Sequence, residues 1–92
     1  MTVTLLLPAV LRACAGGQRE VAVESAGTLR DAFDDLARRL PVLDRRIRDE
    51  QGVLRPHVMV YVDGVSVRGA ADLDTPVHEG TEVFIAPAVS GG

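Results

Sequence analysis

The stretch TLRDAFDDLARRLP, residues 28–41, decides the fold of this 92-residue chain because it predicts a single amphipathic helix. Its apolar residues recur three or four positions apart, which is the spacing of one face of an α-helix. Thr28 can cap the first turn together with Asp31, and Pro41 ends the helix. Phe33 is expected at the centre of the core. The apolar stripe consists of Leu29, Ala32, Phe33, Leu36, Ala37 and Leu40.

The apolar segments on both sides of this helix predict five strands, two before it and three after it. The first is stopped by Pro8, and the second alternates so that Val21 and Val23 share one face. An Asp-Gly pair at residues 63–64 joins two short apolar runs, which is typical of a β-hairpin. The predicted strands are residues 3–7, 19–24, 57–62, 65–67 and 81–87.

A helix between an early pair and a later set of strands indicates an α+β fold, with the helix packed across one face of a mixed sheet. The β-grasp, or ubiquitin-like, roll of four to five strands fits this order. Its first and last strands pair in parallel at the centre of the sheet, which suits the two apolar runs near the ends of the chain. We predict a β-grasp domain over residues 1–87 and a flexible C-terminal tail over residues 88–92.

The connecting segments carry three further expectations. The residues after the first strand are interpreted as a loop with a turn at residues 16–17. Residues 44–52 predict a short helical turn whose charged side chains form a solvated face, and the acids of the main helix are likewise expected in solvent. Residues 70–80 predict an irregular crossing with Leu73 as its buried anchor.

Composition argues against several classes of partner. The net charge is −3 and only three residues are aromatic, whereas nucleic-acid binding needs clustered cations and aromatic platforms. The apolar run near the N-terminus lacks a basic leader and is too short to span a bilayer. A single cysteine, Cys14, excludes an internal disulfide and suits a reducing compartment. We predict a cytoplasmic protein with no nucleic-acid or membrane partner.

No residue pattern indicates catalysis. His57 and His78 are the only histidines, and neither stands in a motif with a nucleophile or with metal-ligand spacing. Cys14 has no neighbouring base along the chain, and one thiolate cannot build a cysteine-ligated metal site. The chain is therefore predicted to have no catalytic side chain, no metal and no bound cofactor, and not to be an enzyme itself.

The ending APAVSGG, residues 86–92, has the properties of a substrate. Beyond Pro87, five residues can reach roughly 16 Å at about 3.3 Å per residue, far enough to carry a carboxylate into a partner's active site. Gly91 and Gly92 have no Cβ, so a narrow channel can close around the backbone. A terminal carboxylate is ionised at neutral pH and a poor electrophile. It must be activated before it reacts, for example as an acyl-adenylate.

Alternation along two of the late strands predicts a partner-docking surface near the tail. The positions expected to face the helix are Val58, Val60, Val62, Val83 and Ile85. Met59, Tyr61 and Phe84 then face outward, where an apolar patch could dock an activating enzyme. The alternatives are scattered exposed residues or a register shifted by one position.

Three segments together resemble the MoaD/ThiS family of ubiquitin-like sulfur carriers, and especially its CysO-type actinobacterial members. They are the opening VTLLLPAVLR, the GGQ loop and the ending FIAPAVSGG. The resemblance covers essentially the whole chain, including a longer segment at residues 41–56 that compact ThiS proteins lack. It implies a thiocarboxylate-forming protein of sulfur metabolism that contributes no catalytic side chain.

The resemblance also implies roles for single residues. Gly92 would bear the carboxylate that an E1-like, MoeB/ThiF-type enzyme adenylates with ATP before sulfur transfer makes it a thiocarboxylate. Gly91 would line the partner's channel, and Pro87 and Val89 match the family's Pro-x-Val spacer. Ser90 stands where alanine is more usual, a change of one hydroxyl that should not block threading of the tail.

Four functions stay open on these residues. The first is a carrier that gives sulfur to biosynthesis of cysteine, a thiosugar or a related metabolite, with a sulfur-accepting synthase and a metalloprotease at the tail as further partners. The second is the small subunit of a molybdopterin synthase. The third is a ubiquitin-like modifier conjugated through Gly92; the absence of lysine prevents lysine-linked chains on itself but not single attachment. The fourth is an interaction domain whose tail has no role.

Overall fold

Five strands form one mixed sheet in the computed structural model, which describes residues 1–67 and 71–87. The strand order is β2-β1-β5-β3-β4. Strands β1 and β5 pair in parallel at the centre, and the other neighbours pair antiparallel. The predicted arrangement of the sheet is confirmed. The strands are β1 (Thr2–Leu6), β2 (Glu20–Glu24), β3 (Val58–Val62), β4 (Val65–Val67) and β5 (Glu82–Pro87).

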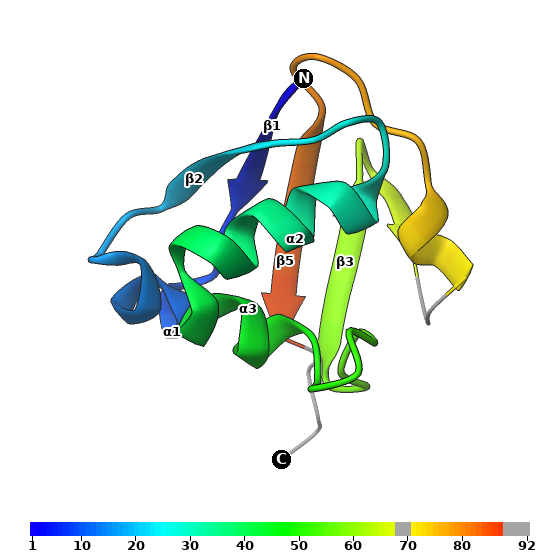
Figure 1. Ribbon diagram of the computed structural model, residues 1–92. Helices are drawn as coiled ribbons and strands as arrows, with labels where there is room; N and C mark the ends of the chain where they lie inside the picture. The colour runs from blue at the N-terminus through cyan, green and yellow to red at the C-terminus, as the bar shows by residue number, and fades with distance from the viewer. Residues whose placement is uncertain (68–70, 88–92) are drawn as a thin grey trace.

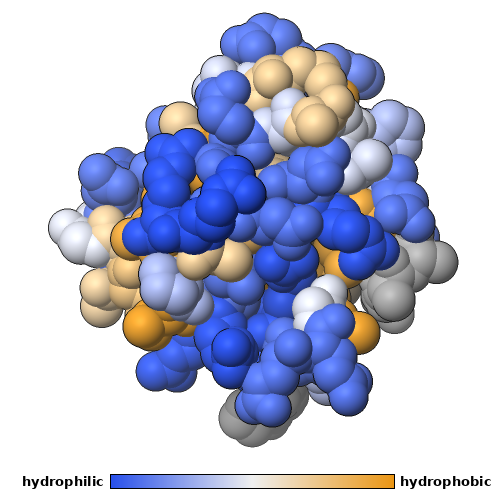
Figure 2. All heavy atoms as spheres, in the orientation of Figure 1, coloured by the Kyte–Doolittle hydropathy of each residue, from blue (hydrophilic) through white to orange (hydrophobic). Residues whose placement is uncertain are grey.

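The main helix, α2 (Leu29–Arg39), packs across one face of the sheet, and α3 (Pro41–Ile47) follows it on the same side (Figure 1). The Thr28 hydroxyl accepts a hydrogen bond from the backbone N–H of Asp31 at 3.2 Å, which confirms the predicted cap. Figure 2 shows that the outer surface of the helices is mostly hydrophilic, as expected for amphipathic helices whose apolar residues face a sheet.

The segment after β1 is helical, where a loop was predicted. It forms the short helix α1 (Ala9–Arg12) and the 3-10 turn η1 (Ala13–Ala15), and a second 3-10 turn, η2 (Ala71–Asp74), lies in the predicted irregular crossing. Alanine and leucine favour helix, and the two glycines at residues 16–17 end it, so the loop begins later than the prediction placed it.

The turn between β3 and β4 is the hairpin turn that the Asp-Gly pair predicts. Asp63 has φ 48° and Gly64 has φ 87°, so both central residues are left-handed, as a type I′ turn requires. The turn sets the register that pairs Val60 with Val67 and places both side chains in the core.

Alternate residues of the strands meet the apolar face of α2 in a single core. The predicted inward positions are confirmed for Val60, Val62, Val83 and Ile85, while Val58 is only partly buried against the core. Leu73 anchors η2 and is fully buried, as predicted. The largest side chains without exposure include Leu5, Leu29, Phe33, Leu36, Leu43, Ile47, Leu73 and Ile85.

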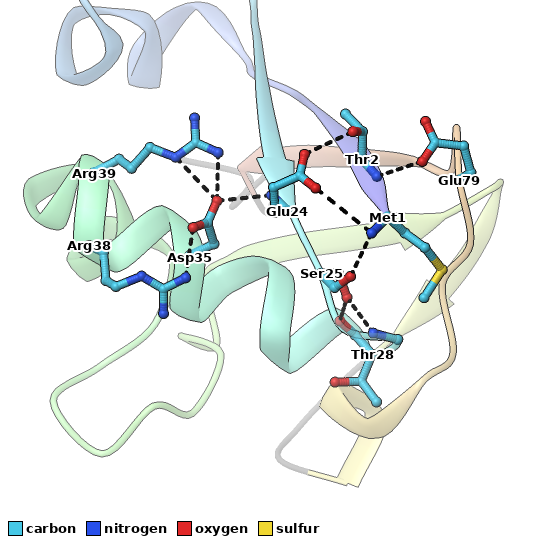
Figure 3. A network of polar contacts seen from close by, with 10 residues as sticks. Met1, Thr2, Glu24, Ser25, Thr28, Asp35, Arg38, Arg39 and Glu79 are labelled. Carbon is cyan, nitrogen blue, oxygen red and sulfur yellow. Dashed lines mark hydrogen bonds and ion pairs between the residues drawn. The ribbon is translucent and has the colours of Figure 1, made fainter.

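Asp35 contradicts the expectation that the acids of the main helix lie in solvent. The residue is buried between α2 and the edge strand β2, where its carboxylate accepts the backbone N–H of Glu24 at 2.9 Å (Figure 3). Arg38 and Arg39 donate to the same carboxylate at 2.8 and 2.6 Å. The hydrogen bond from Glu24, together with these arginines, lowers the pKa of Asp35 from 3.8 to about 2. The carboxylate therefore ties α2 to β2.

Asp44 and Arg48 also contradict the expected solvated face, because both are buried. The Nε of Arg48 donates to Asp44 Oδ1 at 2.8 Å, and its Nη1 donates to Asp34 Oδ1 at 3.0 Å. The guanidinium carbon lies 5.6 Å from the centroid of the Phe33 ring, within cation–π range. Leu43 and Ile47 are buried and hold one face of α3 against the core. The Asp44–Arg48 pair, which lies one position further along the chain, is buried with them.

We expect Asp35→Asn to lower the free energy of unfolding by about 1–2 kcal/mol at neutral pH, because charge-assisted hydrogen bonds are lost. The folded-state pKa of Asp35 lies below its unfolded value, so its stabilisation is complete above about pH 4 and is lost as the pH falls toward about 2. Urea unfolding across this pH range should show that the difference in free energy of unfolding between wild type and variant becomes smaller as the pH falls. Glu20→Gln, at an exposed position, is the control. A difference that does not change with pH would contradict the assignment.

We expect Arg48→Met to destabilise the fold by about 3 kcal/mol, because it leaves the buried Asp44 carboxylate without its cation. The double variant Arg48→Met/Asp44→Leu should recover most of this loss, since no buried charge then remains unpaired. Urea unfolding of both variants measures the difference. A double variant no more stable than the single one would show that the pair is not what holds α3.

Candidate functional site

Strand β5 brings the chain to the point where the predicted tail begins. Pro87 is the last residue of β5, lies opposite Val58 of β3 and is exposed. Proline has no N–H to donate to the ladder. Because β5 lies between β1 and β3, the start of the tail is held by the centre of the sheet. The predicted tail residues Val89, Ser90, Gly91 and Gly92 lie outside the described residues, and their roles stay predictions.

The predicted outward side chains share the sheet face that the described helices leave uncovered. Phe84 is 50% exposed and lies opposite Tyr61, and their rings meet edge to face at a centroid distance of 6.4 Å. Met59 and Tyr61 are partly exposed. Leu6 of β1 lies beside Phe84, and Ala86 of β5 lies opposite Met59. We call these five residues the outer patch.

Sequence reasoning missed two members of the outer patch. Leu6 lies within the apolar run of the first predicted strand, residues 3–7, in which Val3 and Leu5 mark the inward positions of β1. Ala86 follows the alternation of β5, one position after the buried Ile85. The period of two in both strands was the signal that could have found them. The outer patch is thus a continuous apolar surface across β1, β5 and β3.

A groove of about 190 Å³ borders Pro87 on the side of α1 and α3. It adjoins a wider, open hollow lined by Pro41, Val42, Arg45, Arg46, Arg55 and His57, with which it shares Arg46 and His57. His57 lies in the turn directly before β3. The residues lining the groove are Pro8, Val10, Leu11, Arg46, His57, Val58, Ala86 and Pro87.

The remaining candidate residues form no chemical cluster. Cys14 is half-buried in η1 and packs against the core, and His78 lies in a loop where its backbone N–H donates to the Thr81 hydroxyl. Within residues 1–67 and 71–87, no group of three or more His, Cys, Asp or Glu side chains is placed to hold a metal ion. In the same ranges no helix has both the length and the apolar character needed to cross a membrane.

The comparison with known families decides the assignment. The ThiS family matches residues 5–92. The chain belongs to the ThiS family. The sulfur carrier protein CysO of Mycobacterium tuberculosis is 36% identical over an alignment 94 residues long, and the match covers the whole of both chains.

Solved structures confirm the β-grasp prediction. A chain of the Amycolatopsis orientalis BexX/CysO complex superposes with a TM-score of 0.84 at 32% identity, covering 98% of this ThiS-family chain and 99% of that one. SAMP1 from Haloferax volcanii gives a TM-score of 0.81 at 32% identity over the whole of both chains. The full-length relative is named a sulfur carrier protein, in agreement with the prediction that this chain is a protein substrate and not an enzyme itself.

Proposed function

We propose that this ThiS-family protein is a sulfur carrier whose Gly92 carboxylate is adenylated and then converted to a thiocarboxylate. The observation that carries the proposal is the full-length identity of 36% with the sulfur carrier protein CysO. The geometry is compatible with it, because the central strand β5 holds Pro87 at an exposed position. From there five residues can reach roughly 16 Å into an enzyme, at about 3.3 Å per residue.

The chemistry takes place on the partner. A carboxylate oxygen of Gly92 attacks the α-phosphorus of ATP, pyrophosphate leaves, and an acyl-adenylate forms. Hydrosulfide then attacks the acyl carbon, AMP leaves with the bonding electrons, and a proton is released, so that the glycine carries a thiocarboxylate. The E1-like enzyme binds ATP and supplies the catalytic groups. The carrier supplies the tail and the surface that docks it.

The thiocarboxylate sulfur then attacks an electrophilic carbon of an acceptor on a sulfur-accepting synthase, and the acceptor's leaving group departs with the bonding electrons as a thioester forms. Water hydrolyses this thioester, either directly or on a metalloprotease that acts at the tail, which returns the Gly92 carboxylate and frees the product as a thiol. The product class is cysteine, a thiosugar or a related sulfur metabolite, made in the cytoplasm.

A second function, a protein modifier, is favoured by the similarity to SAMP1, a small archaeal modifier protein. A modifier would pass the same activated Gly92 carbonyl to a lysine amine of another protein and form an isopeptide bond. All ten basic residues of this chain are arginine, so it offers no side-chain amine of its own. Covalent adducts in cell extract distinguish this function from a carrier.

We expect the intact mass of the untagged protein from its own host to include a species in which one oxygen is replaced by sulfur. Deletion of Gly92 should abolish that species, because the reacting carboxylate is displaced from its position. Ser90→Ala, which keeps the length of the tail, is the matched control and should retain it. Absence of the species even with ATP, the host's E1-like enzyme and sulfide would contradict the carrier function. Gly92-dependent adducts would favour the modifier.

We also propose the outer patch as the surface that docks the E1-like enzyme. Phe84→Ser should raise the KM for the carrier about tenfold or more in ATP–pyrophosphate exchange, because a half-exposed aromatic anchor is lost. The fold should lose only about 1 kcal/mol, the value of an aromatic pair. Val65→Ser is the control, since Val65 is 67% exposed on the edge strand β4. An unchanged KM would exclude the outer patch as the docking surface.

A further inference from the structure

The groove beside Pro87 has a cationic wall although the chain as a whole is acidic. Arg46 lines the groove, and Arg45 and Arg55 extend its wall into the adjoining hollow. None of the residues lining either space is Asp or Glu. The net charge of the chain is −3, so this local excess of arginine is not a general property of the surface.

Arg46 has the least internal neutralisation of these arginines, because the nearby Asp49 carboxylate attracts both Arg55 and Arg45. Arg46 is exposed, and its side chain forms no hydrogen bond or ion pair with another described residue. Arg45 approaches Glu50 only at 3.8 Å on an exposed surface, where such a pair contributes little. The Nε of Arg55 donates a hydrogen bond to the backbone oxygen of Arg45 at 2.7 Å, and this neutral acceptor does not compensate the charge of the guanidinium. By contrast, Arg48 on the same segment is buried and paired.

The two walls of the groove and hollow also expose large apolar side chains. Val10 of α1 is 71% exposed and Val42 of α3 is 61% exposed. Figure 2 shows a group of hydrophobic residues at the position of α1, beside the hydrophilic surface over α3. A lining of exposed apolar and cationic side chains fits a peptide segment that combines an apolar side chain with carboxylates, rather than a small hydrated anion.

The groove is continuous with the site already described. Ala86 belongs both to the outer patch and to the lining of the groove, and Pro87 ends the strand from which the tail leaves. An enzyme that binds the tail can therefore contact the outer patch on one side of β5 and this groove on the other.

We propose that the groove beside Pro87 is a second docking surface, which receives an acidic segment bearing an apolar side chain from the enzyme that activates the tail. This inference rests on the proposed function, because the partner is the tail-activating enzyme. The acidic segment supplies the carboxylate that Arg46 lacks, and Val10 packs against its apolar side chain.

The test is ATP–pyrophosphate exchange by the host's E1-like enzyme as a function of carrier concentration. Arg46→Glu should raise the KM for the carrier about tenfold or more and leave kcat unchanged. The wild-type KM should rise as the salt concentration increases from about 50 to about 300 mM, and Arg46→Glu should lose most of this dependence. Arg46→Lys should keep a KM close to that of wild type, because the charge is retained.

Arg30→Glu is the control for the change of charge, since it makes the same change on the first turn of α2, away from the groove, where Arg30 pairs with Asp74 of η2. Urea unfolding should show that Arg46→Glu folds as stably as wild type. Equal KM values for the two charge-reversal variants would overturn the inference. The proposed function would still be upheld if the wild-type protein supports exchange and deletion of Gly92 abolishes it. No exchange with wild type overturns both.

Two other occupants would show themselves in the same experiments. A wild-type dimer in sedimentation that Arg46→Glu dissociates would make the groove a self-association surface. A rise only in the KM for ATP would make it a nucleotide site. Either result would overturn the inference.

Discussion

The parallel pairing of β1 with β5 is the constraint on which the rest of the structure depends. It brings the first and last strands of the described chain together at the centre of the sheet, through the pairs Leu5 with Val83 and Leu6 with Phe84. One pair faces the core and the other faces outward. A parallel pair needs a crossover connection, and here the intervening chain supplies the helix that covers the core. The position of Pro87 follows from this pairing.

Two surfaces of different chemistry result from the same strand. On the face away from the helices, β5 presents Phe84 between Leu6 and Tyr61, an apolar surface of the kind that protein partners bury. On the helical side, the end of β5 borders α1 and α3, where the exposed side chains are valine and arginine. A partner that holds both surfaces fixes the direction in which the tail leaves, since β5 lies between them.

Buried charges position the helices that complete this arrangement. Asp35 connects α2 to β2 by a hydrogen bond. The Asp44–Arg48 pair holds α3 against α2 and the Phe33 ring. Arg46 lies on the same helix as Asp44 and is exposed. Its place at the groove therefore depends on a pair that it does not touch. Buried ion pairs are costly to desolvate, and their contribution here is to orient two short elements.

The sequence by itself determined the five strands, the main helix and the family. The apolar period of α2, its Thr28 cap and the Asp63-Gly64 turn are local patterns whose physical causes lie within a few residues, so they could be predicted. The alternation in β3 and β5 likewise gave the outward position of Phe84. Only the tertiary structure decided which charges are buried, because Asp35 and Arg48 lie inward through partners 11 and 14 positions away. The groove, too, joins residues from α1, α3, β3 and β5. No local pattern encodes such a meeting, because it arises when long-range strand pairing places distant segments side by side.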